Sequence, residues 1–118
     1  IKNIKLQVSA PFHCKLMESA TKVMNEELSK TEFKPPKVDI ISNVTSEPTN
    51  DVAIIKELLI NQIEKPVRWR ETVNYMMDNN INKFIEIGPG KVLSGLVKRI
   101  NRNAELLQIN DLEDLKKL

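Results

Sequence analysis

The chain alternates between stretches of two-residue and of three-to-four-residue hydrophobic periodicity, separated by breaks rich in proline and asparagine. Residues 1–9 alternate apolar and polar side chains, which predicts a half-buried strand. Residues 16–30 instead place apolar side chains three and four positions apart, which predicts an amphipathic helix. We expect that helix to end before Pro35 and Pro36, because proline cannot continue it.

The middle of the chain predicts a strand, a turn and a second helix. The apolar run Val38–Val44 is typical of a buried strand, and residues 45–51 are rich in turn formers. Asp51 is a suitable N-cap for a helix over residues 52–63, and Pro66 follows its end.

The second half continues the alternation of helices and strands. The expected elements are a helix over 69–78, a strand over 83–87, a sharp turn at 88–90, a helix over 92–100, a strand over 106–109 and a helix over 111–118. Such alternation predicts the α/β class with mostly parallel strands. A complete doubly wound domain usually has more strands, so the pattern reads like part of a larger α/β fold.

The composition of the chain excludes several classes of protein. The chain has 118 residues, enough for one compact domain, and 41% hydrophobic residues can build a core. Eighteen basic and sixteen acidic residues give a net charge of +2, which argues against a nucleic-acid partner bound by bulk charge. We find neither a signal-peptide pattern nor an uninterrupted apolar run long enough for a membrane span, and we expect no membrane partner. Cys14 is the single cysteine, which excludes an internal disulfide and fits a reducing compartment.

His13 is the only histidine, and it lies between a predicted strand end and a predicted helix start. Ligands of open α/β sheets bind at the carboxyl ends of strands, and a neutral imidazole there can act as a general base. An ordinary loop histidine fits the same position. Cys14 beside it is an alternative nucleophile, although side chains of adjacent residues rarely point together.

Gln62 lies near the end of the helix predicted over 52–63, on the apolar side of that helix. A buried amide requires hydrogen-bond partners, or it costs about 1–3 kcal/mol. Because the helix ends there, the main-chain carbonyl of Gln62 lacks an intrahelical donor and can accept a histidine N–H. Capping of nearby backbone by the glutamine side chain is the other interpretation.

The turn at Gly88-Pro89-Gly90-Lys91 invites a phosphate-loop interpretation, since it joins a strand to a helix. It differs from a Walker loop in its glycine spacing and in the residue after the lysine. A tight strand-to-helix turn is the preferred interpretation.

Four stretches resemble the C-terminal part of the malonyl-CoA:acyl carrier protein transacylase family. They are VSAPFHCKLM (8–17), ISNVTSEPT (41–49), ELLINQIEKPVRWRETVNYM (57–76) and FIEIGPGKVLSGLVKRI (84–100). They cover most of residues 8–100 in the order and spacing of the family, and the combination is highly specific.

The resemblance implies roles for three residues. The family uses a serine–histidine pair, and His13 matches its histidine, which takes the proton of the serine. Gln62 matches the glutamine whose main-chain carbonyl orients that histidine. Phe12 matches a position linked to acyl choice in related polyketide acyltransferases, where an aromatic ring leaves no room for the methyl of a methylmalonyl group.

The resemblance also implies parts that the printed sequence lacks. It contains no G-x-S-x-G motif for a nucleophilic serine, and its arginines do not match the one that pairs with the malonyl carboxylate. The implied fold is the C-terminal portion of an α/β-hydrolase-like core over residues 10–118, with residues 1–9 as the last strand of a ferredoxin-like insert. We therefore expect the isolated chain to be inactive without the N-terminal remainder of the enzyme.

The implied activity is malonyl transfer from coenzyme A to acyl carrier protein in cytoplasmic fatty acid biosynthesis, with no cofactor and no metal. Two alternatives stay open on the sequence alone. One is a non-catalytic α/β interaction module, and the other is the acyltransferase domain of a polyketide synthase.

Overall fold

A computed structural model describes residues 11–116. The strand predicted over residues 1–9 lies outside the described residues, as do the last two residues of the helix predicted over 111–118. The chain divides into two compact units, Ile1–Arg68 and Trp69–Leu118. No helix within the described residues is long and apolar enough to cross a bilayer.

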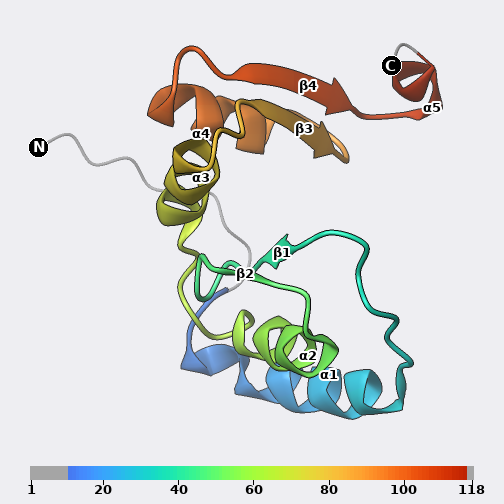
Figure 1. Ribbon diagram of the computed structural model, residues 1–118. Helices are drawn as coiled ribbons and strands as arrows, with labels where there is room; N and C mark the ends of the chain where they lie inside the picture. The colour runs from blue at the N-terminus through green and yellow to red at the C-terminus, as the bar shows by residue number, and fades with distance from the viewer. Residues whose placement is uncertain (1–10, 117–118) are drawn as a thin grey trace, which may run out of the picture. The chain divides into compact units, whose positions relative to one another are not determined.

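The first unit contains two helices that pack on each other (Figure 1). A short 3-10 helix, η1 (Lys15–Met17), leads into α1 (Glu18–Lys30), so the helix predicted over 16–30 is confirmed with a tighter first turn. The second helix, α2 (Val52–Asn61), begins at Asp51, whose carboxylate accepts from the backbone N–H groups of Ala53 and Ile54 at 2.8 and 3.1 Å. This is the predicted N-cap.

The predicted buried strand over 38–44 is wrong. Only β1 (Ile40–Ile41) forms, and it pairs antiparallel with β2 (Pro48–Thr49), within the segment predicted as a turn. The side chain of Ile40 is exposed, since the two-stranded ladder is too short to be covered on both faces. The fold class is mixed α/β with small sheets, one of them a short antiparallel pair.

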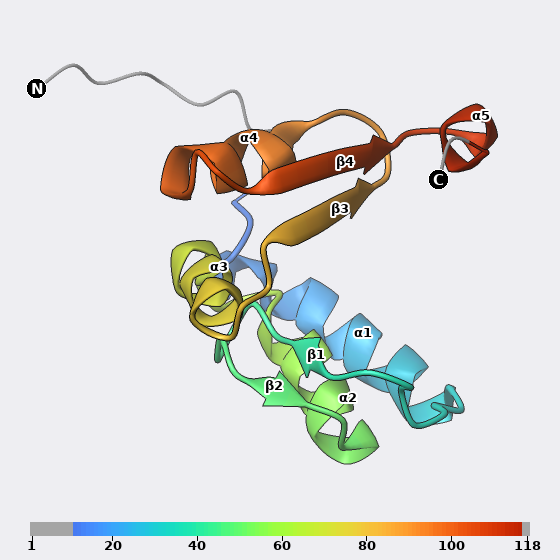
Figure 2. The ribbon, with the colours of Figure 1, turned by 45° about the horizontal axis from the view of Figure 1, so that its top comes forward.

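The second unit is a βαβ unit with an added helix at each end. The helix α3 (Trp69–Asp78), the strand β3 (Lys83–Ile87) and the helix α4 (Val92–Ile100) have the predicted bounds. The strand β4 (Glu105–Ile109) runs parallel to β3 (Figure 2). The register extends from Lys83↔Glu105 to Ile87↔Ile109. A short helix, α5 (Leu112–Leu115), follows.

The core of the second unit lies between α3, α4 and the sheet. Val73 is completely buried on α3, and Val97 on α4 and Ala104 before β4 complete the buried centre. Burying a valine side chain contributes about 1.5–3 kcal/mol. Partly buried apolar residues surround this centre: Trp69, Met76, Met77, Phe84, Ile100 and Leu106.

Candidate active site

His13 lies in a turn whose backbone is left-handed, with a φ of 60°. This region is uncommon for residues other than glycine, and histidine is among the residues enriched there. The backbone N–H of His13 donates to the carbonyl of Ile63 at 3.2 Å, which fixes the turn against the end of α2. The conformation leaves the imidazole exposed at the surface of the first unit.

The imidazole of His13 contacts the main-chain carbonyl of Gln62, with 2.8 Å between Nδ1 and the oxygen. Gln62 is the C-cap of α2, so its carbonyl is one of the last in the helix and has no partner one turn further along. A carbonyl oxygen only accepts, which places the proton on Nδ1. In the neutral ring Nε2 is then the nitrogen with a free lone pair, the form that a general base requires.

The side chain of Gln62 is half-buried, as the pattern of α2 indicated, and its oxygen accepts from the amide of Asn43 at 3.4 Å. The carbonyl of Asn43 in turn accepts from the backbone N–H of Arg68 at 2.9 Å. These contacts tie the 43–46 loop to the segment after α2. The side-chain oxygen of Gln62 therefore accepts a long hydrogen bond from Asn43, while the main-chain carbonyl of Gln62 contacts His13.

Phe12 and Cys14 flank His13 without sharing its contacts. The ring of Phe12 is 56% exposed. The thiol of Cys14 donates to the carbonyl of Pro11 at 3.1 Å, while Nδ1 of His13 is engaged by Gln62. The geometry gives no support to Cys14 as a nucleophile activated by its neighbour.

No family model matches the chain. The malonyl CoA-acyl carrier protein transacylase of Bacillus subtilis is 44% identical over 112 residues, and that of Staphylococcus aureus is 38% identical over 111 residues. These matches cover 95% and 94% of this chain but only 35% and 36% of the relatives.

Solved structures agree with the sequence matches. An acyl carrier protein S-malonyltransferase from Vibrio cholerae superposes with a TM-score of 0.84 at 42% identity, over 95% of this chain and 37% of that chain. A malonyl CoA-acyl carrier protein transacylase from Clostridium perfringens gives 0.85 at 42% identity, over 97% and 36%.

The chain is homologous to part of the malonyl CoA-acyl carrier protein transacylases. The resemblance drawn from the four sequence stretches is thereby confirmed. The chain spans about a third of the length of the transacylases that it matches.

The turn between β3 and α4 of this transacylase-like chain is a tight strand-to-helix connection, as preferred from the sequence. Gly88 and Gly90 have φ values of 135° and 94°, which side chains other than glycine rarely adopt. The first turn of α4 is already occupied, because the carboxylate of Glu86 accepts from the backbone N–H groups of Leu93 at 3.0 Å and Ser94 at 2.8 Å. A phosphate would need these same groups, so the phosphate-loop interpretation fails.

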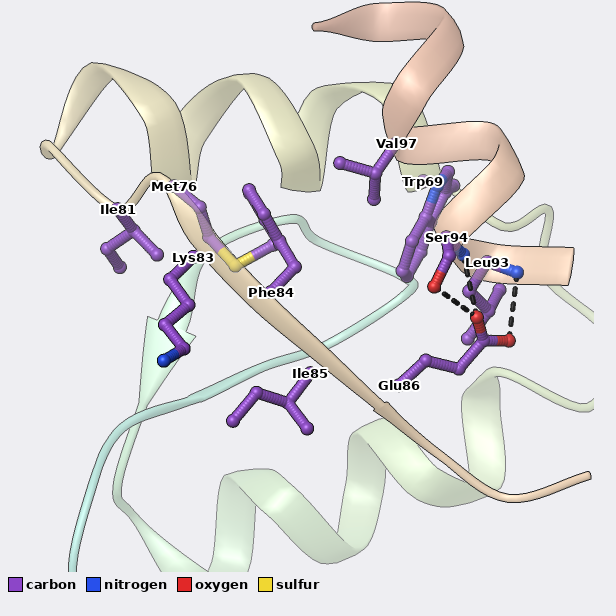
Figure 3. Close-up of a pocket in the computed structure, with 10 residues that line it drawn as sticks. All are labelled: Trp69, Met76, Ile81, Lys83, Phe84, Ile85, Glu86, Leu93, Ser94 and Val97. Carbon is purple, nitrogen blue, oxygen red and sulfur yellow. Dashed lines mark hydrogen bonds between the residues drawn. The ribbon is translucent and has the colours of Figure 1, made fainter. Parts of the chain in front are cut away.

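The carboxylate of Glu86 caps the start of α4 and also accepts from the side chain of Ser94 (Figure 3). The Ser94 hydroxyl donates to the carboxylate at 2.6 Å. This hydrogen bond is the largest influence that lowers the pKa of Glu86, the backbone N–H groups add to it, and burial opposes it. The charged form therefore favours the folded state, because it complements the positive end of α4.

This capping predicts a pH dependence of stability. A lowered pKa in the folded state means that the contribution is complete above the ordinary value of 4.5 and is lost as the pH falls through the lower, folded-state pKa. We expect the urea midpoint to fall further in the natural chain than in Glu86→Gln between about pH 7 and about pH 3. Glu105→Gln on the neighbouring strand is the control, because Glu105 makes only an exposed ion pair with Lys83, at 3.4 Å. Equal acid-induced losses in the natural chain and Glu86→Gln would contradict the assignment.

Three features of the first and second units have little or no signal in the sequence. Asn43 lies within one of the matched stretches but has no periodic signal. Glu86 interrupts the apolar strand KFIEI, and a polar residue pointing toward the following helix start could have indicated a cap. The left-handed backbone of His13 could not be predicted, because glycine and asparagine, the residues that usually mark this conformation, are absent from residues 8–17.

None of the site residues forms a metal-binding set. Among the described residues, no group of three or more histidine, cysteine, aspartate or glutamate side chains could hold a metal ion.

Proposed function

We propose that this chain supplies the base of a malonyl-CoA:acyl carrier protein transacylase. The observation that carries the proposal is the 2.8 Å contact between Nδ1 of His13 and the main-chain oxygen of Gln62, since it leaves Nε2 free to take a proton. His13 and Gln62 lie in two of the four stretches that match the transacylases. Homology over 95% of the chain supports the same assignment.

In the proposed reaction, Nε2 of His13 removes the proton of a serine hydroxyl as that oxygen attacks the malonyl thioester. The thioester C–S bond breaks, and the proton passes from the imidazolium to the sulfur of coenzyme A. The phosphopantetheine thiol of the carrier protein then attacks the malonyl-serine ester, and His13 takes the thiol proton and returns it to the serine oxygen. A general base contributes about 10²–10⁴-fold to each step.

The Gln62 carbonyl acts in this scheme as an orienter. It fixes the ring and its tautomer, and its partial negative charge stabilises the imidazolium that forms during transfer. A neutral carbonyl stabilises that cation less than a carboxylate would, because it carries no full charge.

The proposal assigns the serine, the carboxylate-binding arginine and part of the oxyanion hole to sequence other than the printed 118 residues. Residues 10–118 would be the C-terminal part of an α/β-hydrolase-like core, and residues 1–9 the last strand of a ferredoxin-like insert. The complete enzyme would work in the cytoplasm on malonyl-CoA and acyl carrier protein, with no cofactor. Support for the carrier partner comes from a solved relative, 36% identical, described as a malonyl-transacylase in complex with a type II polyketide acyl-carrier protein.

A chimera tests the proposal. This chain replaces the matching third of the Bacillus subtilis relative, and mass spectrometry measures malonyl loading of carrier protein from malonyl-CoA. We expect the folded chimera to load carrier protein and the isolated 118-residue chain to load none. A folded chimera without activity, or an active isolated chain, would contradict the proposal. Loading carrier proteins of fatty acid and of polyketide synthesis in parallel separates the two carrier classes.

A further inference from the structure

Two segments of the first unit meet at three consecutive positions after α2. Nδ1 of His13 contacts the Gln62 oxygen at 2.8 Å, and the backbone N–H of His13 donates to the Ile63 oxygen at 3.2 Å. One residue further, the carboxylate of Glu64 accepts from the hydroxyl of Thr21 at 2.6 Å. Thr21 lies on α1, which follows His13 in the chain. The three contacts therefore join the segment 13–21 to the segment 62–64.

The contact between Thr21 and Glu64 is the shortest of the three. Both residues are half-buried, and an O–H donor to a carboxylate at this distance makes a charge-assisted hydrogen bond. Within residues 11–116, the hydroxyl has one other hydrogen-bond acceptor, the Met17 carbonyl one turn earlier in the helix, at 3.3 Å. A hydroxyl has one proton to donate, and the shorter distance assigns it to Glu64.

Water can compete for the two hydrogen bonds of His13, because the residue lies at the surface. The ring is exposed, and the backbone of His13 is left-handed, a conformation that persists only where its surroundings determine it. Between His13 and α1 lies the single 3-10 turn Lys15–Met17, which is a less regular connection than an α-helix. An anchor on α1 itself therefore limits how far the two segments can move apart.

We infer that Thr21 and Glu64 are positioning residues that hold the Gln62 carbonyl in line with the imidazole of His13. The pair touches neither the ring nor the reacting atoms, and it acts through the spacing between α1 and residues 62–64. The inference rests on the proposed function only where it treats His13 as a base. The tautomer of the ring is a property of the chain itself.

Nitrogen-15 NMR of the 118-residue chain tests the inference, because its single histidine gives one unambiguous pair of ring signals. In the natural chain we expect shifts typical of a protonated Nδ1 and an unprotonated Nε2. Thr21→Val, which removes the donor at constant size, and Glu64→Ala, which removes the acceptor, are expected to move both shifts toward the average of exchanging tautomers. Thr21→Ser and Glu64→Gln, which keep a donor and an acceptor, are expected to restore them.

Thr31→Val is the matched control, since it removes a hydroxyl that donates to the Glu27 carbonyl at 2.8 Å beyond the last turn of the same helix. Its ring shifts should equal those of the natural chain. If Thr21→Val does not fold, the comparison of Glu64→Ala with Glu64→Gln decides. Unmoved ring shifts in folded Thr21→Val and Glu64→Ala would overturn the inference.

The chimera separates this inference from the proposed function. In it we expect Thr21→Val to lower kcat about 10-fold with little change in KM, because a reacting group misplaced by about 1 Å loses up to about 100-fold. An inactive but folded chimera would refute the proposed function. The NMR shifts would then still decide whether Thr21 and Glu64 position the Gln62 carbonyl. An active chimera with unmoved ring shifts would refute the pair alone.

Discussion

Replacing His13 removes most malonyl transfer in the chimera. We expect His13→Ala to lower kcat by about 10²–10⁴-fold, the usual contribution of a general base, with a small effect on the KM for malonyl-CoA. The loss should fall on kcat, because in the proposed mechanism the ring exchanges a proton with the reacting atoms and does not hold the bound acyl group. Steady-state release of coenzyme A at saturating carrier protein measures it.

The left-handed backbone of His13 complicates the alanine variant, since alanine resists a φ of 60°. His13→Asn is the sharper variant, because asparagine tolerates this conformation and cannot act as a base near neutral pH. Both variants should lose activity to the same extent, while His13→Asn keeps more of the thermal stability. Activity within a few-fold of the natural chimera in His13→Asn would end the assignment of His13 as the base.

Replacing Phe12 is expected to change which acyl group the chimera accepts. The family resemblance implies that the Phe12 ring lies beside the α-carbon of the acyl group, where it would exclude a methyl, and one methyl in an apolar pocket is worth about 1–3 kcal/mol. Phe12→Ser should therefore raise the methylmalonyl-to-malonyl ratio of kcat/KM by about 10- to 200-fold. Competition between the two thioesters, read by mass spectrometry of the loaded carrier protein, gives the ratio directly.

Phe33→Ser provides the control for Phe12. Phe33 is another aromatic residue of the same unit, and its ring lies 4.9 Å from the ammonium group of Lys56. Losing it should lower stability without altering acyl choice. An unchanged ratio in Phe12→Ser, or an equal change in Phe33→Ser, would remove the steric explanation.

Elements with strong local signals were predicted with their true bounds. The helix Trp69–Asp78 places Val73 inward at helical spacing, and its pattern and propensity agree with its burial. The strand Lys83–Ile87 was located by its apolar residues and by the two glycines that follow it, but its burial differs from its hydrophobic pattern: Glu86 is half-buried, while Ile85 and Ile87 are exposed.

The 38–44 segment shows where local signals fail. Its apolar run resembles a core strand, but the turn-forming residues after it reverse the direction of the chain, so that only two residues pair on each side. Pro48 has no backbone N–H and cannot donate a further hydrogen bond to the sheet. Length and burial of a strand depend on its neighbours, which periodicity does not contain.

The candidate site could be assembled only through the family resemblance. His13 and Gln62 are 49 residues apart, and nothing in their local sequence joins them. The helix end at Gln62 did indicate a free carbonyl, which the structure shows engaged. Thr21 and Glu64 are 43 residues apart and lie on unrelated patterns, so only coordinates could pair them.

The group that faces the imidazole of His13 is an oxygen of the polypeptide backbone. Every amino acid carries that oxygen, so no codon change at position 62 can delete it. Replacing Gln62 by every other amino acid would show which side chains the end of α2 tolerates, but it would not test the contact between the carbonyl and the imidazole. Substitution at position 62 itself therefore cannot remove this group, and chemical synthesis with an altered backbone bond is the direct way to do so.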